Sequence, residues 1–492
     1  MTEQQTEQGP IEANQEPGGR RSLRDPGGPT GALLAWLAII GVVSFLALTP
    51  VVHTFFPQLF EKQTEGPVVI EHTPPSGPMR LIAKYSLGAS TLAPGGEEQL
   101  LEQVDAFAAS SPSDKLRAAI VTGAMLGPEA GRDRLDALED DLLAPVEGKP
   151  SSEPGPEFSG AFAIVKRVFT EGSDSLDETQ RDSIVASEGW FGELLLVSDL
   201  PEDNPARAAF FQAARRVTLL LVGAMFALFG VGFVGLGLFI TAIVLFARGR
   251  IRPAYAPPAR GGSVYLEMFA LFLVSFLLIE TGAGIVYNAS GIDLSRAMVW
   301  LILPVMFWPL ARGTDLATWK HAVGWHKGRG VLHEIGAGIL GYLAGLPIVA
   351  VGLVCAIVLS VFVGWLVEAV TGNPGAAASH PAIDEIGQGG VWGVVSLYLL
   401  ASVWAPLFEE TFFRGALYHH MRGRFGFVGS ALIVAFIFAS IHPQGIGLIP
   451  ALMGLAVVFA MIREWRGSII GCMVAHGLHN ATLVTVLLLA LG

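Results

Sequence analysis

The feature that most constrains this fold is a series of long apolar segments separated by short polar loops. An apolar helix needs about 20 residues to cross a bilayer. Hydrophobic residues make up 52% of the 492 positions and charged residues only 15%, which is too apolar for a soluble protein of this size. We therefore predict an all-α polytopic membrane protein with about nine transmembrane helices. The predicted segments are residues 32–52, 217–247, 264–287, 297–310, 335–366, 391–421, 427–441, 446–462 and 468–491.

The N-terminal region combines a polar tail with the first apolar segment. Residues 1–30 are rich in Gln, Glu, Gly and Pro, which predicts a disordered tail. Arginines just before the apolar run place this tail in the cytoplasm. We interpret residues 31–56 as an uncleaved transmembrane anchor. The alternative is a cleaved signal peptide, but the apolar run is longer than a usual signal core and no small-x-small cleavage site follows it.

Between the first and second apolar segments the composition becomes that of a soluble domain. Most of the acidic residues behind the net charge of -12 lie between Glu61 and Asp203. Apolar residues recur there at helical spacing, which is typical of a packed core. We predict that residues 57–215 form an extracytoplasmic, acidic, mainly helical domain without a catalytic signature. The residues of this pattern are Leu100, Leu101, Val104 and Phe107, then Leu116, Ile120 and Val121.

The basic residues of the apolar half predict its topology. Counting spans from a cytoplasmic N-terminus places every basic loop in the cytoplasm, as the positive-inside rule requires. Residues 217–262 are then a transmembrane helix followed by a basic cytoplasmic loop. No long basic run or aromatic-basic pattern indicates nucleic-acid binding. The basic groups are Arg248, Arg250, Arg252 and Arg260; Lys320, Lys327 and Arg329; Arg422 and Arg424; and Arg463 and Arg466.

Three polar clusters interrupt the last apolar segments. A charged side chain at bilayer depth costs about 2.5–3.5 kcal/mol or more, so such residues indicate a functional site by default. If residues 423–426 form the cytoplasmic turn, Glu409 and His442 lie roughly 21–24 Å from that end at about 1.5 Å per residue. Asn480 lies roughly 21 Å from the cytoplasmic end at Arg466, and His476 lies one turn lower. We therefore expect them to meet in one cavity. The clusters are Glu409, Glu410 and Arg414; His442, placed at a helix end by Pro443; and His476 with Asn480.

These residue types and spacings favour peptide hydrolysis by an activated water. Glu410 and Arg414 are four positions apart with the acid first, the favourable order for an ion pair. A carboxylate or imidazole beside water acts as a general base. His476 and Asn480 share one helix face, from which their side chains would stabilise an oxyanion. Taken singly, the clusters fit structural roles: an ion pair, a packed histidine and interhelical hydrogen bonds.

The three clusters resemble the motifs of the CPBP family, the CAAX-protease and bacteriocin-processing membrane proteins related to the eukaryotic prenyl-protein endopeptidase Rce. The family pattern EExxxR, FxxxH and HxxxN occurs here in order. The stretch 324–330 also resembles the segment that precedes the family's core. The resemblance implies a CPBP-like protease core at residues 264–492, in the plasma membrane of a bacterium. The matching positions are Glu409, Glu410 and Arg414, then Phe438 and His442, then His476 and Asn480.

The resemblance also implies residue roles in an intramembrane endopeptidase, with CAAX-type processing as its specific form. Glu409, aided by His442, would activate the attacking water, and His476 with Asn480 would stabilise the oxyanion. Glu410 and Arg414 would orient these groups. The implied partners are membrane lipid and a protein or peptide substrate, membrane-anchored or prenylated.

Two alternatives stay open at this stage. The family has also been described as metalloproteases, in which case Glu409, His442 and His476 would hold Zn²⁺; because Asn is a poor zinc ligand, a site without a cofactor is favoured. His333-Glu334 begins like the zinc motif HExxH, but Ala337 replaces its second histidine. The second alternative is a non-catalytic immunity or scaffold protein, or a transporter, that uses the same polar residues.

Overall fold

The computed structural model describes residues 25–56, 68–108, 111–143, 152–292, 294–371 and 390–491. Almost all regular structure in these residues is helical, which confirms the predicted all-α membrane fold. Most of the tail predicted to be disordered, residues 1–24 of 1–30, lies outside the described residues.

Seven helices of the described chain are long and apolar enough to cross a membrane, and two shorter apolar helices accompany them. Together they correspond to the nine apolar segments expected from the sequence. Six of the long helices are α1 (Pro29–Phe55), α9 (Pro205–Ala247), α10 (Val264–Ser290), α14 (Val331–Thr371), α20 (Ile449–Arg466) and α21 (Ile470–Leu491). The seventh consists of α16 (Gly390–Leu399), η4 (Leu400–Trp404), α17 (Ala405–Glu410), η5 (Thr411–Leu417) and α18 (Tyr418–Arg422).

The two shorter apolar helices are built differently. One is α19 (Phe427–Ser440), a single α-helix. The other begins with α11 (Ser295–Met298), continues as the 3-10 segment η3 (Val299–Phe307) and ends as α12 (Trp308–Ala311). A 3-10 helix rises about 2.0 Å per residue against about 1.5 Å for an α-helix, so this short segment reaches further across the membrane than its length suggests.

The membrane helices expose apolar side chains outward and pack through small residues inside. Phe233 on α9 is 75% exposed and Val361 on α14 is 69% exposed, which fits contact with lipid rather than water. Inside, a Cβ atom at Gly338 of α14 would lie 2.5 Å from the carbonyl oxygen of Gly471 on α21. Such close backbone approach is the usual packing mode of membrane helices.

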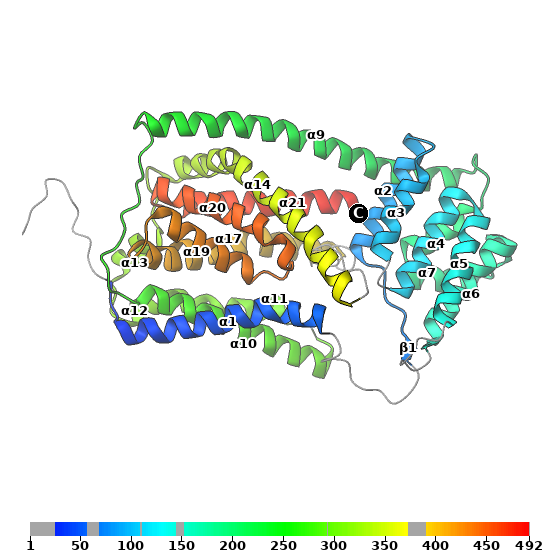
Figure 1. Cartoon of the computed structure of the whole chain (residues 1–492), viewed down its shortest axis with the longest axis horizontal. Helices are drawn as coiled ribbons and strands as arrows, with labels where there is room; N and C mark the ends of the chain where they lie inside the picture. Colours follow the sequence, from blue (N-terminus) through cyan, green and yellow to red (C-terminus); the bar gives the residue numbers. More distant parts are fainter. Residues whose placement is uncertain are drawn as a thin grey trace, which may run out of the picture.

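A helical bundle with its own hydrophobic core precedes α9 and lies at one end of the membrane helices (Figure 1). Two short strands of this region, β1 (Val68–Ile70) and β2 (Ser152–Pro154), pair in parallel with the register Val68↔Ser152. The predicted apolar pattern is buried except at its flanks: Leu100 is half-buried and Phe107 is 37% exposed. The helices are α2 (Gly77–Leu92), α3 (Glu97–Ala108), α4 (Pro112–Leu126), α5 (Pro128–Leu143), α6 (Pro156–Glu171), α7 (Glu178–Glu188) and α8 (Trp190–Ser198), with η2 (Ser173–Ser175).

The bundle and the membrane region share one continuous helix. α9 has 43 residues, about 65 Å at 1.5 Å per residue, roughly twice the bilayer core. Its first turns pack on α2, where a Cβ at Gly88 would meet the carbonyl oxygen of Ala214 at 2.3 Å. The predicted domain limit at 215 therefore falls inside a helix. No Gly or Pro interrupts the chain between Ala206 and Leu221, so the helix continues.

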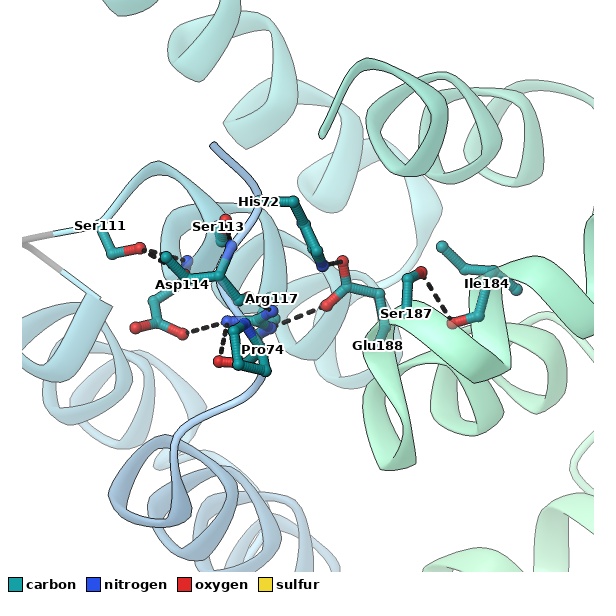
Figure 2. A network of polar contacts seen from close by, with 10 residues as sticks. His72, Pro74, Ser111, Ser113, Asp114, Arg117, Ile184, Ser187 and Glu188 are labelled. Carbon is teal, nitrogen blue, oxygen red and sulfur yellow. Dashed lines mark hydrogen bonds and ion pairs between the residues drawn. The ribbon is translucent and has the colours of Figure 1, made fainter. Parts of the chain in front are cut away.

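A buried charge network holds the bundle together (Figure 2). Arg117 on α4 is fully buried and donates to Glu188 at the end of α7 (2.7 Å) and to Asp114 (2.6 Å). The other oxygen of Glu188 lies 3.4 Å from His72 Nε2. Arg117 also donates to the carbonyl oxygen of Pro74 (3.5 Å), so one guanidinium joins two helices to the segment after β1.

The basic loops predicted for one side of the membrane meet at one end of the helices, opposite the bundle in Figure 1. The backbone N–H of Ala254, after α9, donates to the carbonyl oxygen of Glu464 on α20 (3.1 Å). The carboxylate of Glu464 pairs with Arg422 at the end of α18 (2.8 Å). Arg466 pairs with Glu334 at the start of α14 (2.7 Å). We call this region the basic end.

Candidate active site

The candidate site lies where α17, α19 and α21 approach one another. α17 is a short α-helix between two π-helical segments, η4 and η5, and it ends with Glu409 and Glu410. π-Helical turns are rare and often occur at functional sites. His442 follows the end of α19 at Ser440, as Pro443 predicts, and His476 projects from α21.

Glu410 and Arg414 form a fully buried ion pair. Arg414 Nη1 lies 3.1 Å from Glu410 Oε1, and neither side chain is exposed. Arg414 Nη2 donates to the carbonyl oxygen of Ala456 on α20 (3.1 Å). Its guanidinium also lies 4.9 Å from the ring centre of Phe438 and 5.0 Å from that of Phe459, within the range of cation–π attraction. The cation is therefore neutralised and enclosed.

His476 joins the ion pair to Glu409. Its Nδ1 lies 2.9 Å from Glu410 Oε1, and the ring stacks on Phe459 with centroids 5.1 Å apart. Because a carboxylate only accepts hydrogen bonds, Nδ1 carries the proton and donates it. The other nitrogen, Nε2, then faces Glu409 Oε2 at 4.0 Å.

His442 approaches the same carboxylate oxygen from another helix. Its Nδ1 donates to the carbonyl oxygen of Phe438, and its ring packs on the Phe438 ring with centroids 4.4 Å apart. His442 Nε2 lies 4.0 Å from Glu409 Oε2. Glu409 Oε2 is buried and has no hydrogen-bond partner in the described part of the chain, although its side chain is 20% exposed.

Asn480 is the one predicted site residue for which the described residues show no contact with the others. It lies one turn beyond His476 on α21, and its Nδ2 donates to the carbonyl oxygen of Ala401 in η4 (2.7 Å). α21 reaches η4 at close range because position 477 is glycine: a Cβ atom there would lie 2.7 Å from the carbonyl oxygen of Ser402. Asn480 thus holds α21 against η4, and this bond uses only one of the two N–H groups of its amide.

The spacing of the three side chains does not fit a zinc ion as they stand. Ligand atoms about 2.0–2.2 Å from a tetrahedral ion lie roughly 3.3–3.6 Å apart. Both imidazole nitrogens are 4.0 Å from Glu409 Oε2. Within the described ranges no group of three or more His, Cys, Asp or Glu side chains is arranged to hold a metal ion.

Two residues around the site, Phe459 and Trp325, were not among the predicted site residues. Phe459 contacts both Arg414 and His476, yet in the sequence it is one apolar residue in an apolar helix. Trp325 lies in the stretch 324–330 noted above, and its indole N–H donates to the hydroxyl of Thr411 (2.9 Å). This bond connects the loop before α14 to η5.

Comparison with known protein families supports the resemblance. The family model described as type II CAAX prenyl endopeptidase Rce1-like matches residues 391–482. This range contains all six predicted site residues and is shorter than the predicted core of 264–492. Comparisons with curated proteins and with solved structures found no match. Residues 391–482 thus form an Rce1-like domain of the CAAX protease family, carried by a multi-pass membrane protein.

Proposed function

We propose that this protein is an intramembrane endopeptidase that hydrolyses a peptide bond with a water molecule held between Glu409, His442 and His476. The observation that carries the proposal is the convergence of two imidazole Nε2 atoms, each 4.0 Å away, on the buried and unpartnered Glu409 Oε2. A buried polar atom without a partner needs an explanation, and a bound water is a common one. The family match over residues 391–482 supports peptide hydrolysis as the reaction.

The hydrogen bonds determine how many protons the site must hold. Each imidazole donates its Nδ1–H to an acceptor, so a neutral ring presents a lone pair at Nε2. A water between these two nitrogens and the carboxylate has two protons for three acceptors. One further proton is therefore required, and we place it on His476 Nε2, because this ring already contacts the Glu410 carboxylate through Nδ1.

This assignment gives each residue a role. Glu409 takes a proton from the water as the water oxygen attacks the peptide carbonyl carbon, while His442 orients that water. His476 Nε2–H and the second N–H of Asn480 donate to the developing oxyanion. The C–N bond then breaks, and the amine nitrogen takes the proton from Glu409. Arg414 fixes Glu410, which fixes His476; these two are positioning residues.

The substrate class follows from the family and from the depth of the site. We propose CAAX-type processing of a membrane-anchored or prenylated protein. The common basic end supports an orientation with the N-terminus in the cytoplasm of a bacterium and the α2–α8 bundle outside. The protease core is proposed to extend over residues 264–492, since α10 and α14 pack around the matched domain.

The test is cleavage of a prenylated peptide by the purified full-length protein in detergent micelles. Loss of a general base typically lowers turnover by about 10²–10⁴-fold, which we expect for Glu409→Ala. His442→Ala should also lower turnover, because it removes the group that orients the attacking water. Matched controls are Glu368→Ala and His333→Ala, exposed residues of α14 that should keep wild-type turnover. Equal cleavage by all five proteins would favour the non-catalytic alternative.

A second experiment tests whether turnover depends on a metal ion. We expect turnover to survive dialysis against a zinc chelator, because no proposed step involves a metal. Loss of turnover with recovery on adding Zn²⁺ would instead establish Glu409, His442 and His476 as ligands that move together on binding. An unprenylated peptide of the same sequence shows whether the lipid is required.

A further inference from the structure

The basic end contains a cavity of about 690 Å³ that the proposed reaction does not use. It lies between the loop after α9, the loop before α14 and the end of α20. Among the residues that the structure describes, four arginines and three histidines line it, and no aspartate or glutamate does. These residues are Arg250, Arg252, Arg329, Arg466, His321, His326 and His419.

Three of the four guanidinium groups are available to a ligand. Arg466 is engaged by Glu334 in two hydrogen bonds of 2.9 and 2.7 Å. Arg250, Arg252 and Arg329 are exposed, and no carboxylate lies within 4.0 Å of them in the described residues. Arg252 Nε donates to the carbonyl oxygen of Gly249 (3.2 Å), a neutral acceptor.

Of the three histidines, His419 lies 3.2 Å from the carboxylate of Asp25, and His326 lines the wall without supplying charge. His326 Nε2 contacts the carbonyl oxygen of Gly467 (3.0 Å), and its Nδ1 accepts from the N–H of Gly328 (3.3 Å), so the ring is neutral. Burial lowers the pKa of His326, which keeps it neutral. His321 stacks on His326 with ring centroids 5.2 Å apart. Within the described residues, the wall therefore presents three guanidinium groups that have no carboxylate partner, next to the rings of the histidines.

The cavity also lies at the level where membrane helices end. α9 ends at Ala247, three positions before Arg250, and α14 begins at Val331, two positions after Arg329. Trp465, another lining residue, belongs to the last turn of α20. Tryptophan is enriched at the membrane–water interface, where lipid headgroups lie.

We propose that this cavity binds the phosphate group of an anionic phospholipid headgroup. Arginine pairs with phosphate through parallel N–H donors, and three such groups without carboxylate partners match an anion. The volume lies within the usual range of ligand sites, about 300–1,000 Å³. Basic pockets between membrane helices are known to receive anionic headgroups. The site is separate from Glu409 and does not depend on the proposed reaction.

The test titrates fluorescent phosphatidylglycerol into micelles of the full-length protein. The cavity variant is Arg250→Gln/Arg252→Gln/Arg329→Gln. At about 1 kcal/mol per basic residue near the headgroups, its Kd should rise by about 100-fold. The control variant, Arg248→Gln/Arg260→Gln/Lys327→Gln, removes the same charge from the same loops, and none of its residues lines the cavity. We expect its Kd to change only a few-fold.

Three outcomes decide the proposal. Equal losses in the two variants would overturn it, because general surface attraction would then explain binding. Equal affinity for phosphatidylcholine would also overturn it, since that headgroup has no net charge. If inorganic phosphate alone binds at a site abolished only in the cavity variant and phosphatidylglycerol does not compete, the anion site stands and the lipid is refuted. Monodisperse elution of both variants checks their folding.

Discussion

The buried pair of Glu410 and Arg414 allows a quantitative prediction. Glu410→Gln keeps the shape of the side chain and the oxygen facing His476, but it removes the only carboxylate within 4.0 Å of Arg414 in the described chain. Removing one partner of a buried ion pair costs about 3–5 kcal/mol. Since Arg414 keeps the Ala456 carbonyl and its aromatic neighbours, we expect the lower end of this range.

The assay is thermal unfolding of the purified protein in micelles. For a core of about 150–250 residues, 1 kcal/mol shifts Tm by about 2–4 °C, so Glu410→Gln should lower it by roughly 6–12 °C. The control Glu171→Gln removes an acid from an exposed pair with the same four-residue spacing, Arg167 with Glu171. Exposed pairs contribute little, and we expect a shift below about 2 °C.

The double variant Glu410→Gln/Arg414→Met separates charge from packing. It removes both charges, and an uncharged pair of similar volume is often as stable as the ion pair. We expect it to recover more than half of the Tm lost in Glu410→Gln. The single variant Arg414→Met completes the comparison. If its loss of Tm and that of Glu410→Gln simply add in the double variant, an uncompensated buried charge is not the cause of the destabilisation. The same holds if Glu410→Gln unfolds within about 2 °C of wild type.

Two further predictions concern the rest of the molecule. Gly477→Ala would place a Cβ 2.7 Å from the Ser402 carbonyl oxygen. We expect about 1–3 kcal/mol of destabilisation and lower turnover, whereas Gly393→Ala, with open space around it, should do neither. Burial raises the pKa of Glu188 above its usual 4.5 despite Arg117. The folded state therefore favours protonated Glu188. The stability that this protonation gives the bundle is fully present below pH 4.5 and is lost as the pH rises through the native pKa. Glu188→Gln should remove this loss, measured by hydrogen exchange of α4 and α7 in the full chain.

Sequence reasoning worked well where one physical constraint dominates. The bilayer requires long apolar helices, and the nine segments followed from that requirement. The expectation that the clusters with Glu409, His442 and His476 would meet followed from helical rise and from turn positions. The structure places Nε2 of both histidines 4.0 Å from one carboxylate oxygen.

Sequence reasoning worked less well where contacts between helices determine the local structure. The π-helical segments around α17 have no separate signature, because they depend on packing against neighbours rather than on local preference. Phe459 became part of the site only through the register of α20 against α21. The domain limit at 215 missed the continuous α9 because composition changes along that helix while its backbone does not.

The two adjacent carboxylates, to which the family resemblance gives different roles, also have different surroundings in the fold. Glu410 Oε1 already accepts from Arg414 and His476, and its side chain is fully buried, so it would have to give up a charged partner to take a proton from water. Glu409 Oε2 accepts no hydrogen bond in the part of the chain that the structure describes; it faces two imidazole nitrogens at 4.0 Å, and the side chain retains 20% exposure. A general base must accept a proton without breaking the structure around it. In the mechanism proposed above, that requirement favours Glu409 as the group that activates water and Glu410 as the group that holds His476 in place.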